Sequence, residues 1–213
     1  MDAFLLHALK LMRPGPGRSI YVVEEPELGG AGRPDLVFVT IPAATLRKYQ
    51  QSGLRLSSQA SARLLDSQVG TNSRGVSPSY AQNLRRELAV QGWTQVKAEH
   101  LASMVTDTFA VEAKIRDWRR AMHQVARFRR MFDRSAILMP QRELPPETWR
   151  SLDFYRCGLL FRDGSEFDWV REPTTETPPM WSRLWLLELI LRGLDSGRAY
   201  KLSDFRKSAR ASR

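Results

Sequence analysis

The chain has 213 residues, of which 42% are hydrophobic and 26% are charged, and these values exclude wholesale disorder. It carries 33 lysines and arginines against 23 acidic residues, and the net charge of +10 favours a polyanionic partner such as nucleic acid over a basic surface kept for solubility. The single cysteine, Cys157, excludes an internal disulfide or a zinc cluster, and its apolar neighbours predict a buried, inert thiol in a reducing compartment.

The first residues lack the features of a secretory signal. No basic segment precedes the apolar stretch within residues 1–12, and no small-residue cleavage site follows it. The apolar stretch at residues 184–191 is too short to span a bilayer. We therefore expect a cytoplasmic protein that does not engage a membrane.

The chain begins with a predicted helix and a predicted β-hairpin. Apolar residues recur at helical spacing over residues 4–12, and the Pro and Gly residues at 14–17 end that helix. β-Branched and aromatic residues predict strands at 19–24 and 36–41, and the glycine-rich turn at 29–32 joins them as an antiparallel hairpin.

The next segment, residues 42–104, is predicted to be a helical insertion. Its glycine-punctuated apolar pattern predicts three short helices, at 45–51, 58–67 and 79–91, and Gly92 is a C-terminal stop signal for the third. The run Trp-Thr-Gln-Val at 93–96 predicts the start of a strand.

Strands and helices alternate beyond residue 104. The expected strands are 108–115, 135–139, 157–161 and 167–170, and the expected helices are 118–132 and 146–153. This order predicts an α/β fold in which one mixed sheet is flanked by helices. We expect residues 1–41 and 105–172 to form a discontinuous core around the insertion.

The segment 173–213 begins with a proline-rich linker at 173–179. The helix predicted at 181–192 is apolar nearly all round, so we expect it to dock on the core, with a homodimer or partner interface as the alternative. Residues 199–213 predict a basic, frayed tail.

Two charged residues interrupt the strand expected at 108–115. If side chains alternate there, Ala110, Glu112 and Lys114 share one face. Burying a carboxylate on an otherwise apolar strand is costly unless it gains a partner. Glu112 is therefore a candidate cation ligand and Lys114 a candidate catalytic neighbour, and the alternative is a surface ion pair on an edge strand.

Asp35 follows Pro34 at the mouth of the second hairpin strand. Because proline cannot donate to a sheet ladder, we expect Asp35 to open the strand with its carboxylate near the end of the sheet. The alternative is a turn carboxylate without a functional role.

Pro34-Asp35 and Glu112-Ala113-Lys114 together resemble the PD-(D/E)xK nuclease superfamily, which has the restriction-endonuclease-like fold. Gln124 and Phe128, on the helix expected after Lys114, resemble the QxxxY element of one branch of that superfamily, with phenylalanine in place of tyrosine. The resemblance covers residues 1–41 and 105–172, and the helical insertion accounts for the long separation between the two motifs.

The resemblance implies hydrolysis of phosphodiester bonds in DNA, with RNA as the alternative, assisted by Mg²⁺ or Mn²⁺. It implies that Asp35 and Glu112 hold the metal together with a backbone carbonyl near Ala113. It also implies that Lys114 orients the attacking water or stabilises transition-state charge, and that Gln124 positions a nucleotide or a metal-bound water.

Members of the superfamily often carry an acidic ligand on the first helix, where this chain offers only Asp2. Glu24, Glu25 and Glu27 on the hairpin are the expected substitutes, and Glu25 is the candidate third metal ligand.

Arginines crowd the helix expected at 118–132, which begins beside the proposed site. We expect them to contact phosphates, and the alternative is a solvated cationic face. The candidates are Arg116, Arg119, Arg120, Arg127 and Arg130.

The third helix of the insertion resembles the recognition helix of a winged-helix module. Ser79, Gln82, Asn83 and Arg86 would face a DNA groove, while Tyr80, Leu84 and Leu88 would pack inward.

Together these features predict a Mg²⁺-dependent DNA endonuclease or a nuclease-like DNA-processing protein. Two alternatives stay open: a catalytically inactive nuclease-fold protein that binds DNA, and a subunit of a defence or repair complex that joins its partners through the C-terminal helix.

Overall fold

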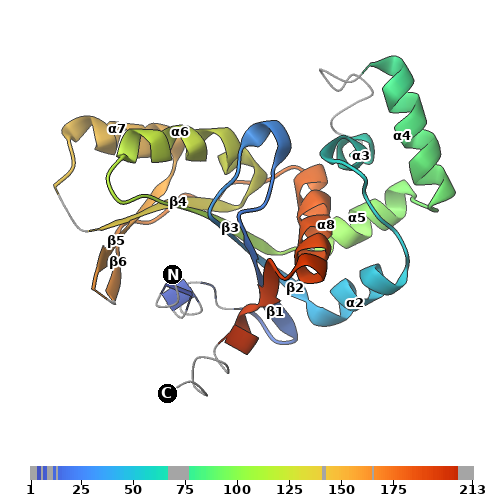
Figure 1. Ribbon diagram of the computed structural model, residues 1–213, viewed down its shortest axis with the longest axis horizontal. Helices are drawn as coiled ribbons and strands as arrows, with labels where there is room; N and C mark the ends of the chain where they lie inside the picture. The colour runs from blue at the N-terminus through green and yellow to red at the C-terminus, as the bar shows by residue number, and fades with distance from the viewer. Residues whose placement is uncertain are drawn as a thin grey trace.

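The computed structural model describes residues 4–5, 7–8, 12, 14–66, 77–140, 143–164 and 166–205. In these residues, seven strands form one mixed sheet in the order β6-β5-β4-β3-β2-β1-β7, with helices packed against it (Figure 1). The expected α/β architecture with a mixed, helix-flanked sheet is therefore confirmed.

The strands pair in a simple sequence of directions. β1, β2 and β3 form an antiparallel meander, β3, β4 and β5 run parallel, and β6 and β7 are antiparallel to β5 and β1 at the two edges. The predicted hairpin is thus confirmed. The strands are β1 (Arg18–Glu24), β2 (Leu36–Pro42), β3 (Asp107–Ala113), β4 (Arg134–Pro140), β5 (Gly158–Asp163), β6 (Glu166–Arg171) and β7 (Ala199–Lys201).

The helices follow the apolar periodicity of the sequence. α6, for example, turns Ala121, Met122, Val125 and Phe128 toward the sheet and exposes most of its arginines. Among the described residues, no helix is long and apolar enough to cross a membrane. The helices are α2 (Ala43–Gln51), α3 (Gln59–Leu64), α4 (Pro78–Val90), α5 (Gln95–Met104), α6 (Trp118–Phe128), α7 (Pro146–Tyr155) and α8 (Met180–Ser196), with 3-10 turns η1 (Gly29–Ala31) and η2 (Arg129–Met131).

The two faces of the sheet bury separate apolar clusters. Helices α6 and α7 cover one face, and the N-terminal helical segment covers the other (Figure 1). On the second face, the Phe38 ring contacts the rings of Phe4 and Phe109, with centroid distances of 6.0 and 5.9 Å. The alternation of side chains along each strand divides the core in this way.

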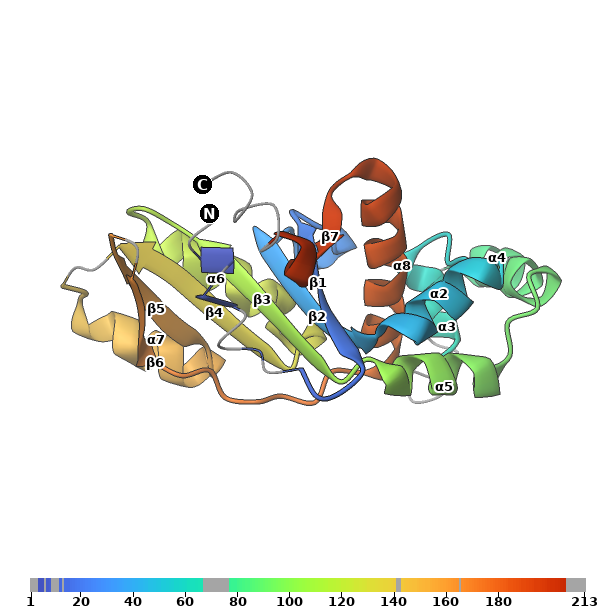
Figure 2. The ribbon, with the colours of Figure 1, turned by 90° about the horizontal axis from the view of Figure 1, so that it is seen from below.

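Helix α8 lies between the sheet and helices α2 to α5 (Figure 2). Its Glu188 carboxylate is 2% exposed and accepts hydrogen bonds from the Tyr49 hydroxyl at 2.9 Å, the Leu56 amide at 3.1 Å and the Arg192 Nε at 3.0 Å. The expected docking of this helix on the core is therefore confirmed.

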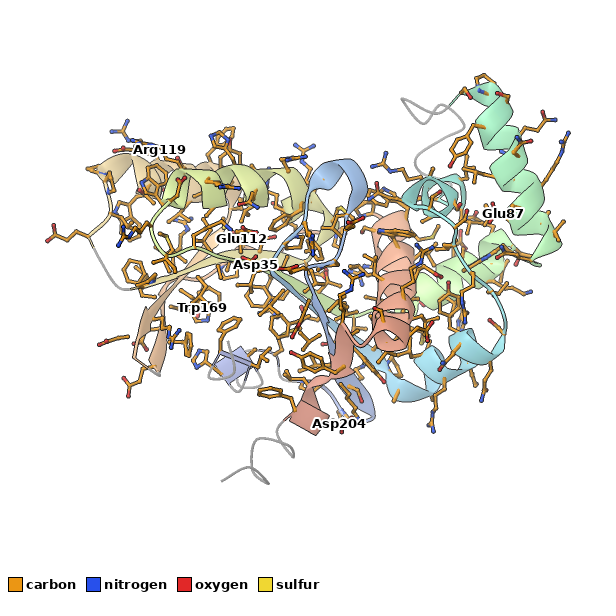
Figure 3. All side chains as sticks on the ribbon, in the orientation of Figure 1. Asp35, Glu87, Glu112, Arg119, Trp169 and Asp204 are labelled. Carbon is orange, nitrogen blue, oxygen red and sulfur yellow. The ribbon has the colours of Figure 1, made fainter. Side chains whose placement is uncertain are left out.

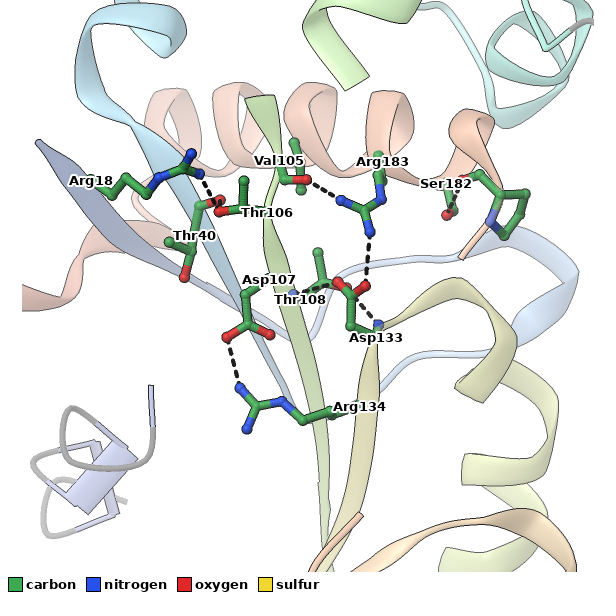
Figure 4. Close-up of polar contacts among 11 residues, drawn as sticks. Arg18, Thr40, Val105, Thr106, Asp107, Thr108, Asp133, Arg134, Ser182 and Arg183 are labelled. Atoms are coloured by element: carbon green, nitrogen blue, oxygen red, sulfur yellow. Dashed lines mark hydrogen bonds and ion pairs between the residues drawn. The ribbon is translucent and has the colours of Figure 1, made fainter. Parts of the chain in front are cut away.

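A polar network joins the starts of β3, β4 and α8 (Figure 4). Asp133 accepts hydrogen bonds from the backbone amide and the hydroxyl of Thr108, at 2.9 and 2.8 Å, and pairs with Arg183 at 2.8 Å. Arg183 also donates to the carbonyl of Val105. The network therefore ties a helix near the C-terminal end of the chain to two central strands.

The prediction that a strand begins at 93–96 is wrong, because Thr94 caps helix α5, which begins at Gln95. The Thr94 side chain accepts a hydrogen bond from the Lys97 amide at 3.2 Å and so caps the helix. Thr94 and Val96 are residue types that favour strands, but the capping contact decides the local structure. Within 43–66 and 77–104 the structure contains helices and no strand, so the expected wing strand is not found there.

The frayed tail expected from residue 199 is also wrong for residues 199–205. β7 pairs with β1, with Val22 opposite Tyr200, and residues 202–205 are helical; residues 206–213 lie outside the described part. Gly193 allows the close approach, since a Cβ there would lie 2.5 Å from the Cβ of Ala199. A three-residue strand is too short for sequence periodicity to reveal it.

Candidate active site

Three of the predicted site residues converge where β2 begins and β3 ends. Leu36 is paired with Val111 in the antiparallel register. Asp35 precedes Leu36 and Glu112 follows Val111, so the two acidic residues lie beside each other (Figure 3). Lys114 follows the last residue of β3. Sheet pairing therefore brings together residues that are distant in the sequence.

Backbone hydrogen bonds fix this arrangement. The Asp35 Oδ2 accepts a hydrogen bond from the Ala113 amide at 2.6 Å, and the Lys114 amide donates to the Leu138 carbonyl at 2.9 Å. The Lys114 Nζ forms an ion pair with Glu112 Oε1 and lies 3.8 Å from Asp35 Oδ2. The ammonium group therefore contacts both carboxylates.

The two carboxylates differ in their exposure to solvent. The Glu112 side chain is 0% exposed, whereas that of Asp35 is 30% exposed. The pKa of Glu112 is raised to about 7, chiefly by burial and to a lesser extent by the Asp35 charge. The hydrogen bond and charge of Lys114, together with the Arg120 charge, oppose this rise. Glu112 is therefore a group that titrates near neutral pH.

Two oxygen atoms of the predicted site residues are buried without a hydrogen bond from any described residue: Glu112 Oε2 and, on α6, Gln124 Oε1. Such orphaned acceptors are rare in native proteins and call for a donor or a cation. The types of donor atom also fit, because carboxylate and carbonyl oxygens are hard donors suited to Mg²⁺.

The described residues contain no group of three or more His, Cys, Asp and Glu side chains arranged to hold a metal. Asp35 and Glu112 are thus a two-carboxylate set. Mg²⁺ commonly binds through one or two carboxylates and keeps several waters, so the two-carboxylate set fits this ion.

Glu25, the expected third ligand, lines the same cavity as Asp35, and its amide donates to the Asp35 carbonyl at 3.0 Å. It does not complete a three-carboxylate metal group among the described residues. Its carboxylate pairs with Arg33, and Arg33 Nε also donates to the Glu25 carbonyl at 3.0 Å. Glu24 accepts a hydrogen bond from the Tyr200 hydroxyl at 3.0 Å, and Asp2 lies outside the described residues.

A cavity of about 580 Å³ opens beside Asp35. Its wall includes Ala113, Arg198 and Tyr200. Arg198 and Tyr200 were not predicted from the sequence, because Arg198 flanks and Tyr200 lies in the three-residue strand β7, which carries no periodic signal. The cavity gives Asp35 access to solvent from the side of β7.

The predicted phosphate-binding arginines are spread along α6 and its ends. Arg120 lies close enough to Glu112 for its charge to act on that carboxyl, and Arg127 donates to the Gly30 carbonyl at 2.9 Å. Arg119 pairs with Glu147 at 2.9 Å, whereas the exposed Arg116 precedes the helix. Arg130 is exposed at the opposite end of α6.

The candidate groove-facing residues of α4 are exposed. Gln82, Asn83 and Arg86 are exposed, and Leu84 and Leu88 are buried as expected. Tyr80, expected to pack, is 47% exposed because Ala81 occupies the inward position instead. Helix α4 lies far from Asp35 and Glu112, near the other end of the molecule (Figure 3).

Cys157 is fully buried, so the expected burial of its thiol is confirmed, and burial raises the pKa of the thiol to about 12.

No protein family and no curated protein matches the chain. One solved structure is similar to it: the SPO1766 protein of unknown function from Silicibacter pomeroyi, with 11% sequence identity, a TM-score of 0.41, and coverage of 84% of this chain and 76% of that chain.

Proposed function

We propose that the protein is a metal-dependent nuclease that hydrolyses phosphodiester bonds in DNA and has a restriction-endonuclease-like fold. The observation that carries this proposal is the convergence of Asp35, Glu112 and Lys114 from two paired strands, with a buried carboxylate oxygen that no described residue satisfies. The order of elements also supports it, since the β1-β2-β3 meander is followed by α6, which carries Gln124, and by the parallel strand β4.

Asp35 and Glu112 would hold Mg²⁺ or Mn²⁺. The bound ion would supply Lewis-acid polarisation of the phosphate and a lowered pKa for a bound water. The hydrogen bond from the Ala113 amide to Asp35 Oδ2 orients the Asp35 carboxylate for this role. The other oxygen of this carboxylate, Oδ1, takes no part in that bond. Glu112 is held in a water-poor position on β3, so its ligand geometry is pre-organised.

Lys114 would donate hydrogen bonds to a phosphate oxygen or to the attacking water. Its ammonium, 3.8 Å from Asp35 Oδ2 and paired with Glu112, lies beside both groups that would bind the metal. Gln124 Oε1, which accepts nothing from the described residues, would accept a hydrogen bond from a water or a nucleotide.

The test is cleavage of supercoiled plasmid and single-stranded DNA with Mg²⁺, with Mn²⁺ and with EDTA. Glu112→Gln and Lys114→Ala should each lower the rate by about 10²-fold or more, because each removes a charged group from the reacting centre. The matched control is Glu147→Gln, which removes an exposed carboxylate that pairs with Arg119. Cleavage that survives Glu112→Gln at the wild-type rate would contradict the proposal.

A second candidate is a nuclease-fold protein that binds DNA without cleaving it. The contact of Lys114 with both carboxylates favours it, because the lysine already neutralises the site. In this case the wild type would bind duplex DNA with a steep salt dependence and cleave none of it. The exposed face of α4 would contribute to that binding, and replacing Gln82, Asn83 and Arg86 together by alanine should weaken it.

A further inference from the structure

A second cleft, of about 540 Å³, lies at the far end of α6 from Glu112. It is formed by four segments: η2 after α6, the end of α7, the linker before α8 and the start of α8. Its lining includes Arg129, Arg130, Phe154, Arg156, Glu176 and Trp181.

The cleft is cationic and partly rigid. Glu176 pairs with Arg129 at 2.8 Å and lies 3.8 Å from Arg156, so one carboxylate orients two guanidinium groups. Arg130 adds a third guanidinium, and its side chain is exposed. The lining thus carries three positive charges against one negative charge, which favours an anionic ligand.

Aromatic rings lie next to these charges. Phe154 is 75% exposed, and its ring contacts Tyr155 edge to face with centroids 4.9 Å apart. The Trp181 ring carries the Arg63 guanidinium on one face at 4.5 Å. An exposed, sterically supported phenylalanine beside arginines is a suitable stacking surface for a nucleobase.

Arg156 gives an independent indication. It ends α7 with φ of 52°, in the left-handed region, where glycine is the usual residue. The left-handed conformation is strained for an arginine, and the Arg156 guanidinium lies in the wall of the cleft.

We propose that this cleft binds a nucleotide of single-stranded nucleic acid, with the base on Phe154 and the phosphates at Arg130 and Arg156. Binding in the cleft requires no metal. Its role along a substrate strand rests on the proposed nuclease function. Arg120 and Arg130 are separated by about 15 Å of helix, a distance that about four nucleotides span even at the fully stacked rise of about 3.4 Å each, so one strand would reach both sites.

The test is fluorescence anisotropy of a labelled oligothymidylate of about 16 nucleotides, measured in EDTA over a range of salt concentrations. Phe154→Leu should weaken binding by about fivefold or more, and Phe154→Tyr should bind like the wild type, because the ring and not the bulk supports stacking. Arg130→Ala should weaken binding and lower the log–log salt slope by about 0.7. Arg150→Ala removes an exposed arginine of α7 outside the cleft and serves as the charge control.

Wild-type affinity in both Phe154→Leu and Arg130→Ala would overturn the proposal. Equal losses in Arg130→Ala and Arg150→Ala would also overturn it, because the effect would then be one of net charge. A covalently closed circular duplex that loses the same affinity on Phe154→Leu would do so as well, since the bases inside a duplex have both faces covered and cannot stack on the ring. Failure of the nuclease proposal is distinguishable, because it appears as absent cleavage with this metal-free binding intact.

Discussion

Among single residues, Glu112 is distinguished by a side chain that is completely buried and by an ion-pair partner, Lys114, that also contacts Asp35. Its pKa of about 7 follows from burial, and its Lys114 neighbour does not fully compensate. A group whose pKa is higher in the folded state than its ordinary value of 4.5 favours folding when protonated. Its contribution is therefore fully present below pH 4.5 and is lost as the pH rises through 7.

Glu112→Gln should remove this pH dependence. The free energy of unfolding of the variant, relative to the wild type, should rise between pH 4.5 and pH 7 by on the order of 3 kcal/mol, since each pKa unit corresponds to about 1.4 kcal/mol. Urea unfolding in EDTA at several pH values measures the difference. A difference that stays constant with pH would show that Glu112 does not titrate in this range.

Glu112 and Lys114 were predictable because charges on an apolar strand are conspicuous in the sequence. Asp35 was found through its proline and through the family resemblance. Arg198 and Tyr200 at the neighbouring cavity were not found, since they reach it through pairing of β7 with β1, a contact with no local signal. Glu25 shows the converse: its position was plausible, but Arg33 holds its carboxylate.

At the scale of elements, local capping and long-range ion pairs decide what periodicity leaves ambiguous. The residues at 93–96 have strand-forming side chains, yet the Thr94 cap begins a helix. In the same way, nothing in the sequence around Asp133 marks it as the residue that joins β3, β4 and α8. Most strands and helices were predictable because their apolar patterns are long enough to read.

Asp133→Ala should destabilise the protein by roughly 3 kcal/mol, because it leaves Arg183 and the Thr108 amide without their acceptor. Asp107→Ala is the matched control, since its ion pair with Arg134 is more exposed and should contribute about 1 kcal/mol or less. Thermal and urea unfolding measure both. Equal losses in the two variants would mean that the Asp133 network does not connect the three elements energetically.

At the scale of the whole molecule, α8 is the element that connects the sheet to helices α2 to α5. Glu188 of α8 and Tyr49 of α2, which are 139 residues apart in the sequence, form a hydrogen bond in this contact. The α/β class was predictable from the alternation of elements, and the docking of α8 on the core was predictable from its apolar sequence. The contact of α8 with helices α2 to α5 was not predictable, because the sequence around neither partner identifies the other. From this contact we predict that the sheet and helices α2 to α5 unfold together.

Unfolding of the wild type should therefore give coincident transitions by tryptophan fluorescence and by far-ultraviolet circular dichroism. Glu188→Ala should destabilise the protein by roughly 3 kcal/mol, because the Tyr49 hydroxyl, the Leu56 amide and Arg192 lose their common acceptor. The matched control is Asp195→Ala on the exposed end of the same helix. Two separate transitions in the wild type would contradict the coupling.

The position of α8 also has a consequence for synthesis on the ribosome. Helices α2 to α5 end at Met104, but the helix that covers them begins only at Met180. At about 5–20 residues per second, translation of the intervening segment takes roughly 4 to 15 s. During that interval the apolar surfaces of α3 and α5 and the open edge of β1 lack their native cover, which makes the nascent chain a candidate client for chaperones.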